Sequence, residues 1–186
     1  MQENQLIDKC LRGDGIAFKQ LINNYRSQLF GYMWRYSNSR FEAEEMFQET
    51  LIKVWKGLKK YNHQQKFSSW LFTIGHNVAM DSIRRRKKDI LFSSIADNFE
   101  MHAPNKPDEE IIREEQIRLI NESVDGLSEK QKAVFLLRQH GDLTFKEIAE
   151  TINEPLNTVI SHMHYAIKKI KKQLEVKNEP RRKAII

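Results

Sequence analysis

Apolar residues recur three or four positions apart along most of this chain, and this spacing restricts its fold more than any other feature. Such spacing places apolar side chains on one face of an α-helix, whereas a half-buried strand would alternate. Only 7 glycines and 4 prolines interrupt the pattern in 186 residues. The sequence therefore predicts an all-α fold of two small helical domains joined by a flexible linker, with a helix-turn-helix in the C-terminal domain.

The N-terminal part of the chain predicts four helices, at residues 6–11, 18–33, 39–58 and 68–88. The third is the best defined, because Ser39 and Glu42 form a capping-box pattern at its start. Charged and amide side chains lie opposite its apolar stripe. The fourth helix leads into a basic run, Arg84 to Lys88.

Charge divides the chain into three blocks. Residues 1–88 carry a net charge of +8, residues 89–126 one of −7 and residues 127–186 one of +5. We expect a first domain at 1–88, an acidic linker at 89–110, a second domain at 111–176 and a basic tail at 177–186. Basic blocks attract a polyanion such as DNA and an acidic connector is repelled by it, although ordinary solvated surface carries similar charges.

Residues 144–174 predict a helix-turn-helix. Thr144 and Glu147 form a capping box at the first helix, and Asn153 stands where the chain must turn sharply. Asparagine tolerates the left-handed backbone conformation that such a turn requires. In this motif the second helix lies in the major groove of DNA, but two helices that pack on a protein would give the same pattern.

The second helix of this motif divides into two faces. Val159 and Met163 are expected to point inward. The residues expected to contact bases are Thr158, Ile160, Ser161, His162 and Tyr165, and those expected to reach phosphates are Lys168, Lys169, Lys171 and Lys172.

Aromatic residues accompany the basic run of the fourth helix. Tyr61 and Phe67 precede the fourth helix, and Trp70 lies within this helix. Aromatic rings beside basic residues can stack on unpaired bases, as in proteins that bind single strands. Burial preference favours a core position for Trp70 over such a role.

No catalytic or metal-binding arrangement is found in the sequence. Cys10 is the single cysteine, and the chain has no HExxH motif, phosphate loop or dinucleotide fingerprint. Glu44, Glu45 and Glu49 have no histidine beside them, which favours an acidic surface over a metal site. We therefore expect neither an enzyme nor a cofactor. The polar N-terminus and the lack of a long apolar run predict a cytoplasmic protein that does not insert into a membrane.

Three segments, in this order, resemble the extracytoplasmic-function group of bacterial sigma factors. Residues 42–55 (EAEEMFQETLIKVW) resemble the segment that binds the clamp helices of RNA polymerase. Residues 67–88 resemble the helix that melts and reads the minus-ten promoter element, and residues 127–159 resemble the minus-thirty-five-binding domain. The resemblance covers nearly the whole chain and implies an alternative sigma factor that binds core RNA polymerase and directs promoter-specific initiation of transcription.

The resemblance also implies roles for individual residues. The polymerase-facing residues would be Glu45, Gln48, Glu49 and Lys53. The minus-ten DNA contacts would be Tyr61 and Asn77, which hold a flipped base beside the loop at 62–66, and the phosphate-binding Arg84, Arg85, Arg86 and Lys87. The acidic linker would run toward the RNA exit path of the polymerase. A membrane-bound anti-sigma factor would hold the protein inactive.

The recognition helix departs from the family pattern. Basic residues usual in the family are replaced here by Ile160, His162, Tyr165 and Ile167, which leaves the minus-thirty-five sequence open.

Two other functions are compatible with the residues. A stand-alone helix-turn-helix regulator would work without polymerase but would leave the surface at 42–55 without a task. An adaptor would bind polymerase or an inhibitor without reading DNA.

Overall fold

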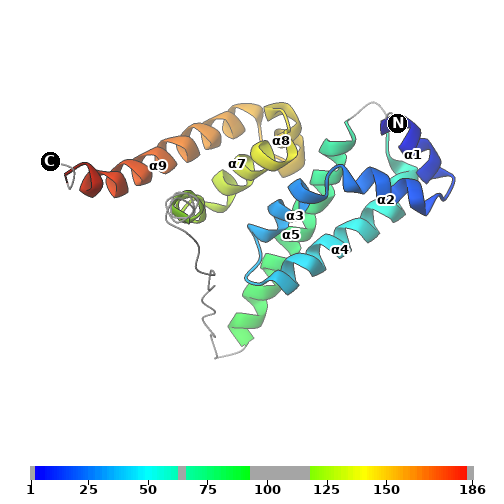
Figure 1. Cartoon of the computed structure of the whole chain (residues 1–186), viewed down its shortest axis with the longest axis horizontal. Coiled ribbons are helices and arrows are strands. Elements are labelled where there is room, and N and C mark those ends of the chain that lie inside the picture. The colour runs from blue at the N-terminus through cyan, green and yellow to red at the C-terminus, as the bar shows by residue number, and fades with distance from the viewer. Residues whose placement is uncertain (1–2, 63–65, 93–117, 184–186) are drawn as a thin grey trace. The chain divides into compact units, whose positions relative to one another are not determined.

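The computed structural model describes residues 3–62, 66–92 and 118–183. Side chains are described over residues 3–62, 66–89 and 118–175. Every regular element within these ranges is helical, which confirms the predicted all-α fold (Figure 1). The predicted linker at 89–110 overlaps the end of the first domain's last helix, and its remainder lies outside the described residues.

The N-terminal domain is a set of helices joined by short turns. They are α1 (Glu3–Leu11), α2 (Gly15–Asn23), α3 (Arg26–Trp34), α4 (Arg40–Gly57), the 3-10 helix η1 (Leu58–Lys60) and α5 (Phe67–Phe92). The C-terminal part contains helical residues 118–125, then α7 (Glu129–Gly141), α8 (Phe145–Ile152) and α9 (Leu156–Lys183). The last helix continues past residue 174, where the sequence predicted its end.

The single helix predicted over residues 18–33 is wrong, because the chain forms two helices there. Asp14 caps α2 and accepts hydrogen bonds from the backbone N–H groups of Ile16 and Ala17 at 2.9 and 3.0 Å. The helix ends at Asn23, where two asparagines follow one another. Asparagine side chains compete for local backbone groups and weaken a helix interior, so α3 begins separately after Tyr25.

The capping box at the start of α4 is confirmed. The Ser39 hydroxyl accepts a hydrogen bond from the backbone N–H of Glu42 at 3.1 Å. The Glu42 carboxylate in turn accepts one from the backbone N–H of Asn38 at 2.7 Å. These bonds satisfy N–H groups that a helix start would otherwise leave unpaired, so the sequence itself determines where α4 begins.

Helices α3, α4 and α5 pack together and form the main core of the N-terminal domain (Figure 1). Their fully buried side chains include Leu29, Tyr32, Met33, Met46, Val54, Phe67, Leu71 and Phe72. The hydroxyl of Tyr32 lies 2.8 Å from Nδ1 of His76 inside this core. Burial lowers the pKa of His76 to about 4, so the imidazole is neutral near pH 7 and the two buried polar groups satisfy each other.

Two further capping boxes are present in the C-terminal part, and that of Thr144 and Glu147 confirms the prediction. The Ser128 hydroxyl accepts from the Gln131 N–H at 3.4 Å, and the Gln131 side chain accepts from the Ser128 N–H at 3.3 Å. The Glu147 carboxylate accepts from the Thr144 N–H at 2.7 Å. Both helices therefore start where the sequence places them.

None of the helices in the described ranges has the length and apolar character of a membrane span.

Candidate functional surfaces

The outer face of α4 carries the residues predicted to face polymerase. The side chains of Glu45, Gln48 and Lys53 are exposed, and that of Glu49 is half-buried. Helix α4 holds them in this position because its opposite face is anchored in the core through buried residues such as Met46. The four predicted side chains thus lie within one accessible part of a single helix.

Exposed apolar side chains share this face of α4. Phe41 is 70% exposed, Ile52 54% and Trp55 39%. Together with Glu45 and Gln48 they stand alternately four and three positions apart, which places them in one stripe along the helix. A stripe of this spacing is the type of seam against which a second helix packs. Sequence reasoning missed Phe41 and Ile52, although the same heptad spacing was present in the sequence.

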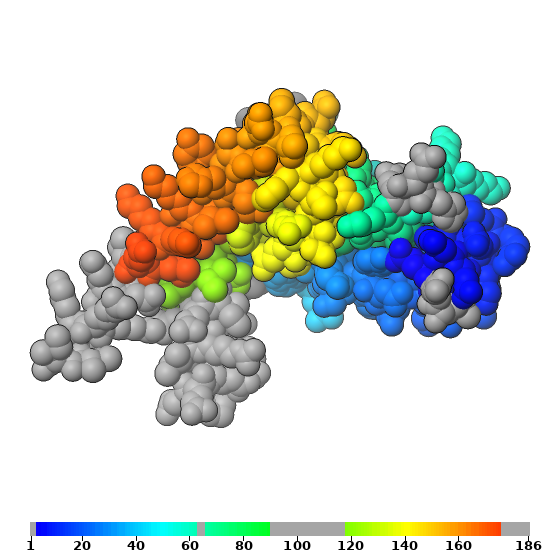
Figure 2. All heavy atoms as spheres, turned by 90° about the horizontal axis from the view of Figure 1, so that it is seen from above, coloured from blue at the N-terminus to red at the C-terminus, as the bar shows by residue number. Residues whose placement is uncertain are grey.

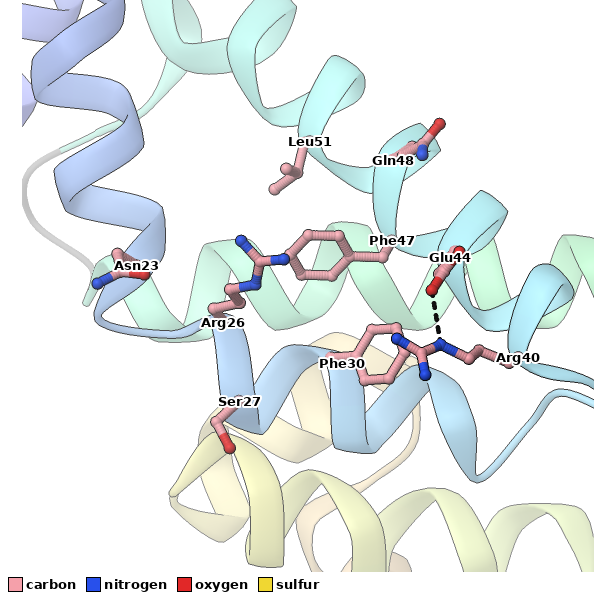
Figure 3. A pocket seen from close by; sticks show the side chains of 9 residues that line it. All are labelled: Asn23, Arg26, Ser27, Phe30, Arg40, Glu44, Phe47, Gln48 and Leu51. Carbon is pink, nitrogen blue, oxygen red and sulfur yellow. Dashed lines mark hydrogen bonds and ion pairs between the residues drawn. The ribbon is translucent and has the colours of Figure 1, made fainter.

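A groove lies between α3 and α4 beside this stripe. It has a volume of about 690 Å³ and is lined by Asn23, Arg26, Ser27, Phe30, Arg40, Glu44, Phe47, Gln48 and Leu51. Figure 3 shows Phe30 of α3 and Phe47 of α4 projecting between the two helices, and their ring centroids are 6.0 Å apart. Arg40 pairs with Glu44 at 2.9 Å at the edge of the groove. The surface is therefore apolar at its centre and charged at its rim.

A second hollow lies on the other side of α4, toward α5. It measures about 550 Å³ and is lined by Glu42, Glu45, Met46, Gln48, Glu49, Ile52, Ser82, Arg85, Arg86 and Asp89. Acidic residues of α4 meet the basic end of α5 across it. Gln48 lines both hollows, so it stands at the crest of the surface that α4 presents.

Glu49 is held by cations from two helices. Its carboxylate lies 2.9 Å from Lys53 Nζ on α4 and 3.2 Å from Arg85 Nη2 on α5. The hydrogen bond from Lys53 contributes most to lowering the pKa of Glu49, and Arg85 adds to the effect. A residue predicted to face polymerase and one predicted to bind DNA phosphates therefore contact each other.

The basic run at the end of α5 does not form one uniform surface. Arg86 is only 28% exposed, and its Nη1 lies 2.8 Å from Glu42 Oε1 and donates to the carbonyl oxygen of Tyr36 at 3.3 Å. Arg84 is 77% exposed and pairs with Asp81 of the same helix at 2.9 Å. Arg86 thus joins α5 to α4, a structural contact that the sequence run did not reveal. Lys87 is exposed.

Tyr61 belongs to an aromatic cluster with Tyr25, Phe67 and Trp70. Its ring centroid lies 5.7 Å from that of Phe67 and 5.2 Å from that of Trp70. Tyr61 is 9% exposed and Phe67 is fully buried, whereas Trp70 is half-buried. Asn77 is exposed about two turns further along α5. The cluster lies next to the predicted loop at 62–66, whose residues 63–65 are outside the described ranges.

The turn between α8 and α9 has the backbone expected of a helix-turn-helix. Helix α8 ends at Ile152, and Asn153 adopts a φ of +54°, in the left-handed region. Glycine and asparagine enter that region at the lowest cost, so Asn153 serves in the turn as predicted. Helix α9 then begins at Leu156, directly after Pro155.

The first turns of α9 separate an inner from an outer face. Val159 is fully buried and Met163 nearly so, as predicted. The predicted DNA-contacting residues Ile160, Ser161, Tyr165, Lys168 and Lys169 are exposed, and Thr158 and His162 are half-buried. This part of α9, orange in Figure 2, lies at the surface in that view.

One exposed lysine of α9 makes a contact within the protein. The Nζ of Lys169 donates to the carbonyl oxygen of Gly126, so its ammonium is partly engaged within the protein. Tyr165 is 56% exposed and Ile160 44%, so the outer face has an apolar and aromatic part that is followed by the lysines from residue 168 on. Among the described residues, no group of three or more potential ligands could hold a metal ion.

Comparison with protein families assigns both helical parts. Residues 21–89 match the model for sigma-70 region 2, and residues 124–172 match the model for sigma-70 region 4. The first match contains α3, α4 and most of α5, and the second contains α7, α8 and α9 up to residue 172.

Relatives and solved structures agree with these matches. The chain is 26% identical to the ECF RNA polymerase sigma factor SigW of Bacillus subtilis, over 94% of this chain and 97% of that one. It is 25% identical to the ECF RNA polymerase sigma-E factor of Haemophilus influenzae, over 94% and 96%. Its fold resembles that of CnrH, solved with the cytosolic domain of CnrY, with a TM-score of 0.70, 19% identity and coverage of 94% and 97%. It also resembles the sigma factor RpoE of Bartonella quintana, solved with the anti-sigma factor NepR, with a TM-score of 0.71, 20% identity and coverage of 86% and 97%.

Proposed function

We propose that the two domains of this chain, which belongs to the extracytoplasmic-function group of the sigma-70 family, together direct core RNA polymerase to promoters. The chain is an initiation factor and not an enzyme, so its residues act by binding and positioning. The observation that carries the proposal is the order of two matched domains, each with an accessible surface of the required chemistry.

The stripe on α4 is the proposed polymerase-binding surface. Exposed Phe41, Ile52 and Trp55 supply apolar contact area, and Glu45 and Gln48 between them supply polar specificity. Because these residues follow heptad spacing, the surface suits a helical partner, such as the clamp helices that the resemblance implies. Glu49 and Lys53 extend the polar part of the surface toward the hollow beside α5.

The end of α5 and the aromatic cluster form the proposed minus-ten surface. Arg84, Arg85 and Lys87 are exposed and suit phosphate binding. Trp70 lies in the first turn of α5 and contacts the ring of Tyr61, which follows η1, and Asn77 of α5 offers an exposed amide that can hydrogen bond to a base. Extruding a base costs on the order of a few kcal/mol, which stacking and hydrogen bonds of this kind can offset.

The outer face of α9 is the proposed minus-thirty-five surface. Ser161, Tyr165 and the half-buried Thr158 would contact base edges, and Lys168 would contact phosphates. The apolar Ile160 lies among these residues and suits contact with a thymine methyl group. Other residues replace the basic contacts that are usual in the family. The minus-thirty-five sequence that this surface would read should therefore differ from the one that those basic contacts read.

Partners and location follow from the same assignment. The fold neighbours were solved with an anti-sigma factor or with the cytosolic domain of a partner, and we infer that this chain also has an anti-sigma partner. Core polymerase and promoter DNA are its other partners, and we therefore expect it to act in the cytoplasm.

Complex formation tests the proposal against the stand-alone regulator. Labelled promoter DNA is mixed with the protein, with core polymerase, and with both, and complexes are separated by native gel electrophoresis. The proposal expects sequence-specific retention only when both proteins are present. Specific binding by the protein alone, unchanged by polymerase, would instead identify a stand-alone regulator.

A further inference from the structure

The aromatic cluster is held by ring contacts on several sides. The centroids of Phe67 and Trp70 are 5.9 Å apart, and those of Tyr25 and Phe67 are 5.7 Å apart. With Tyr61 these rings form a connected group in tilted and edge-on arrangements, which are the favoured geometries for aromatic pairs. A shift of Tyr25 would therefore reach Trp70 through Phe67, which is fully buried between them.

Helix α1 fixes this group from outside the matched family segment. The hydroxyl of Tyr25 donates a hydrogen bond to the Glu3 carboxylate at the start of α1. Residues 3–11 precede the region 2 match, which begins at residue 21, so that match gives α1 no role. Leu6, Ile7 and Cys10 are nonetheless buried, and α1 packs against α2 and η1. Glu3 is thus held in place by a well-anchored helix.

The bond between Glu3 and Tyr25 is maintained at neutral pH. Burial, together with the hydrogen bond and the charge of Glu3, raises the pKa of the Tyr25 phenol, so it stays protonated and remains a donor. Helix α1 also packs against the 3-10 helix η1, which Tyr61 follows directly. Both tyrosines of the cluster are therefore adjacent to elements that α1 contacts.

We propose that Glu3 is a positioning residue for the minus-ten surface: through Tyr25 it orients the aromatic cluster, and so α1 contributes to promoter melting without touching DNA. This inference rests on the proposed role of the cluster in holding unstacked bases. A single hydrogen bond of this kind changes an equilibrium by about three- to tenfold, which sets the size of the expected effect.

The test compares variants of the full chain in holoenzyme on a promoter mapped by transcript sequencing. Tyr25→Phe removes only the hydroxyl and Glu3→Ala removes the acceptor, whereas Glu3→Gln removes the charge but keeps an oxygen that can accept the bond. Gln5→Ala changes an exposed residue of the same helix and is the matched control. Promoter melting is measured by permanganate reactivity of thymines, alongside polymerase affinity and the thermal unfolding midpoint.

We expect Tyr25→Phe and Glu3→Ala to lower melting about three- to tenfold at unchanged polymerase affinity, with Glu3→Gln and Gln5→Ala close to wild type. Wild-type melting by Glu3→Ala would overturn the role of Glu3. A template with a pre-melted bubble should restore transcription by Tyr25→Phe, because the lost step is bypassed. Equal loss of melting and polymerase affinity would overturn the inference, since it would indicate only a damaged fold.

A Trp70→Ala variant separates this inference from the proposed function. If Trp70→Ala impairs melting but Tyr25→Phe does not, the cluster binds DNA without help from α1 and the inference is overturned. If Trp70→Ala leaves melting unchanged, the role of the cluster fails and the inference fails with it.

Discussion

Arg85 and Glu49 form an ion pair of 3.2 Å that joins the basic end of α5 to the outer face of α4. The residues are 36 positions apart in the chain, and each belongs to a different proposed surface. The Arg85 side chain is 63% exposed and that of Glu49 33%, so the pair is near the surface and adds little to stability.

The pH dependence of Glu49 follows from these contacts. Lys53 and, to a lesser extent, Arg85 lower its pKa, so the contribution of the carboxylate to stability is present above the usual glutamate pKa, about 4.3. It is lost as the pH falls through the lowered value in the folded state. The difference in unfolding midpoint between wild type and Glu49→Gln should therefore be small and constant near pH 7 and should decrease below about pH 4. A difference that grows on acidification would contradict the assignment.

Replacing Gln48 and Glu49 together by alanine should weaken polymerase binding by about tenfold or more, because central interface residues carry most of the binding energy. The fold should stay intact, since Gln48 is exposed and the ion pairs of Glu49 are near the surface. Fluorescence titration with core polymerase measures the affinity. Gln20→Ala, an exposed amide on α2, serves as the control and should bind like wild type. Wild-type affinity of the double variant would remove α4 from the interface.

Arg86 and Arg84 should respond differently to alanine substitution. Arg86 is mostly buried and bonds to Glu42 and to a backbone carbonyl, so Arg86→Ala should reduce the free energy of unfolding by about 2 kcal/mol. Arg84 is 77% exposed, and Arg84→Ala should change it by less than about 0.5 kcal/mol. Urea denaturation of both variants measures the difference. Equal effects would show that the Arg86 contacts do not join α5 to α4.

Lys168 and Lys169 should differ in their contributions to DNA binding. Lys168→Ala should reduce the slope of log affinity against log salt concentration by about 1, as expected for one lost phosphate contact. Lys169→Ala should reduce it less, because the Lys169 ammonium bonds to the carbonyl oxygen of Gly126. Holoenzyme binding to a promoter fragment at several salt concentrations provides both slopes. A larger change for Lys169 would indicate that it leaves Gly126 to contact DNA.

Local features of the fold were predictable from the sequence. The capping box of Ser39 and Glu42 depends on residues three positions apart, and so does that of Thr144 and Glu147. Burial of Val159 and Met163 follows from helical periodicity alone. The break between α2 and α3 was missed because the apolar stripe continues across it, while the two asparagines that end α2 give only a weak signal.

Contacts between distant segments were not predictable. Arg86 looked like any member of a basic run, but packing of α5 on α4 places it against Glu42, 44 positions away. Tyr61 was expected beside a base, and its burial among Phe67 and Trp70 depends on how η1 meets α5. The roles of these residues toward DNA and polymerase stay predictions, because they concern molecules that bind from outside.

Transcription in vitro tests the central claim most directly. Core RNA polymerase is incubated with fragmented genomic DNA, with and without the protein, and the 5′ ends of the transcripts are sequenced. If the protein is a sigma factor, new start sites should appear that require it. These sites should share sequence elements about ten and thirty-five base pairs upstream, with a spacing set by the two DNA-binding domains. Start sites that are the same with and without the protein would contradict the account.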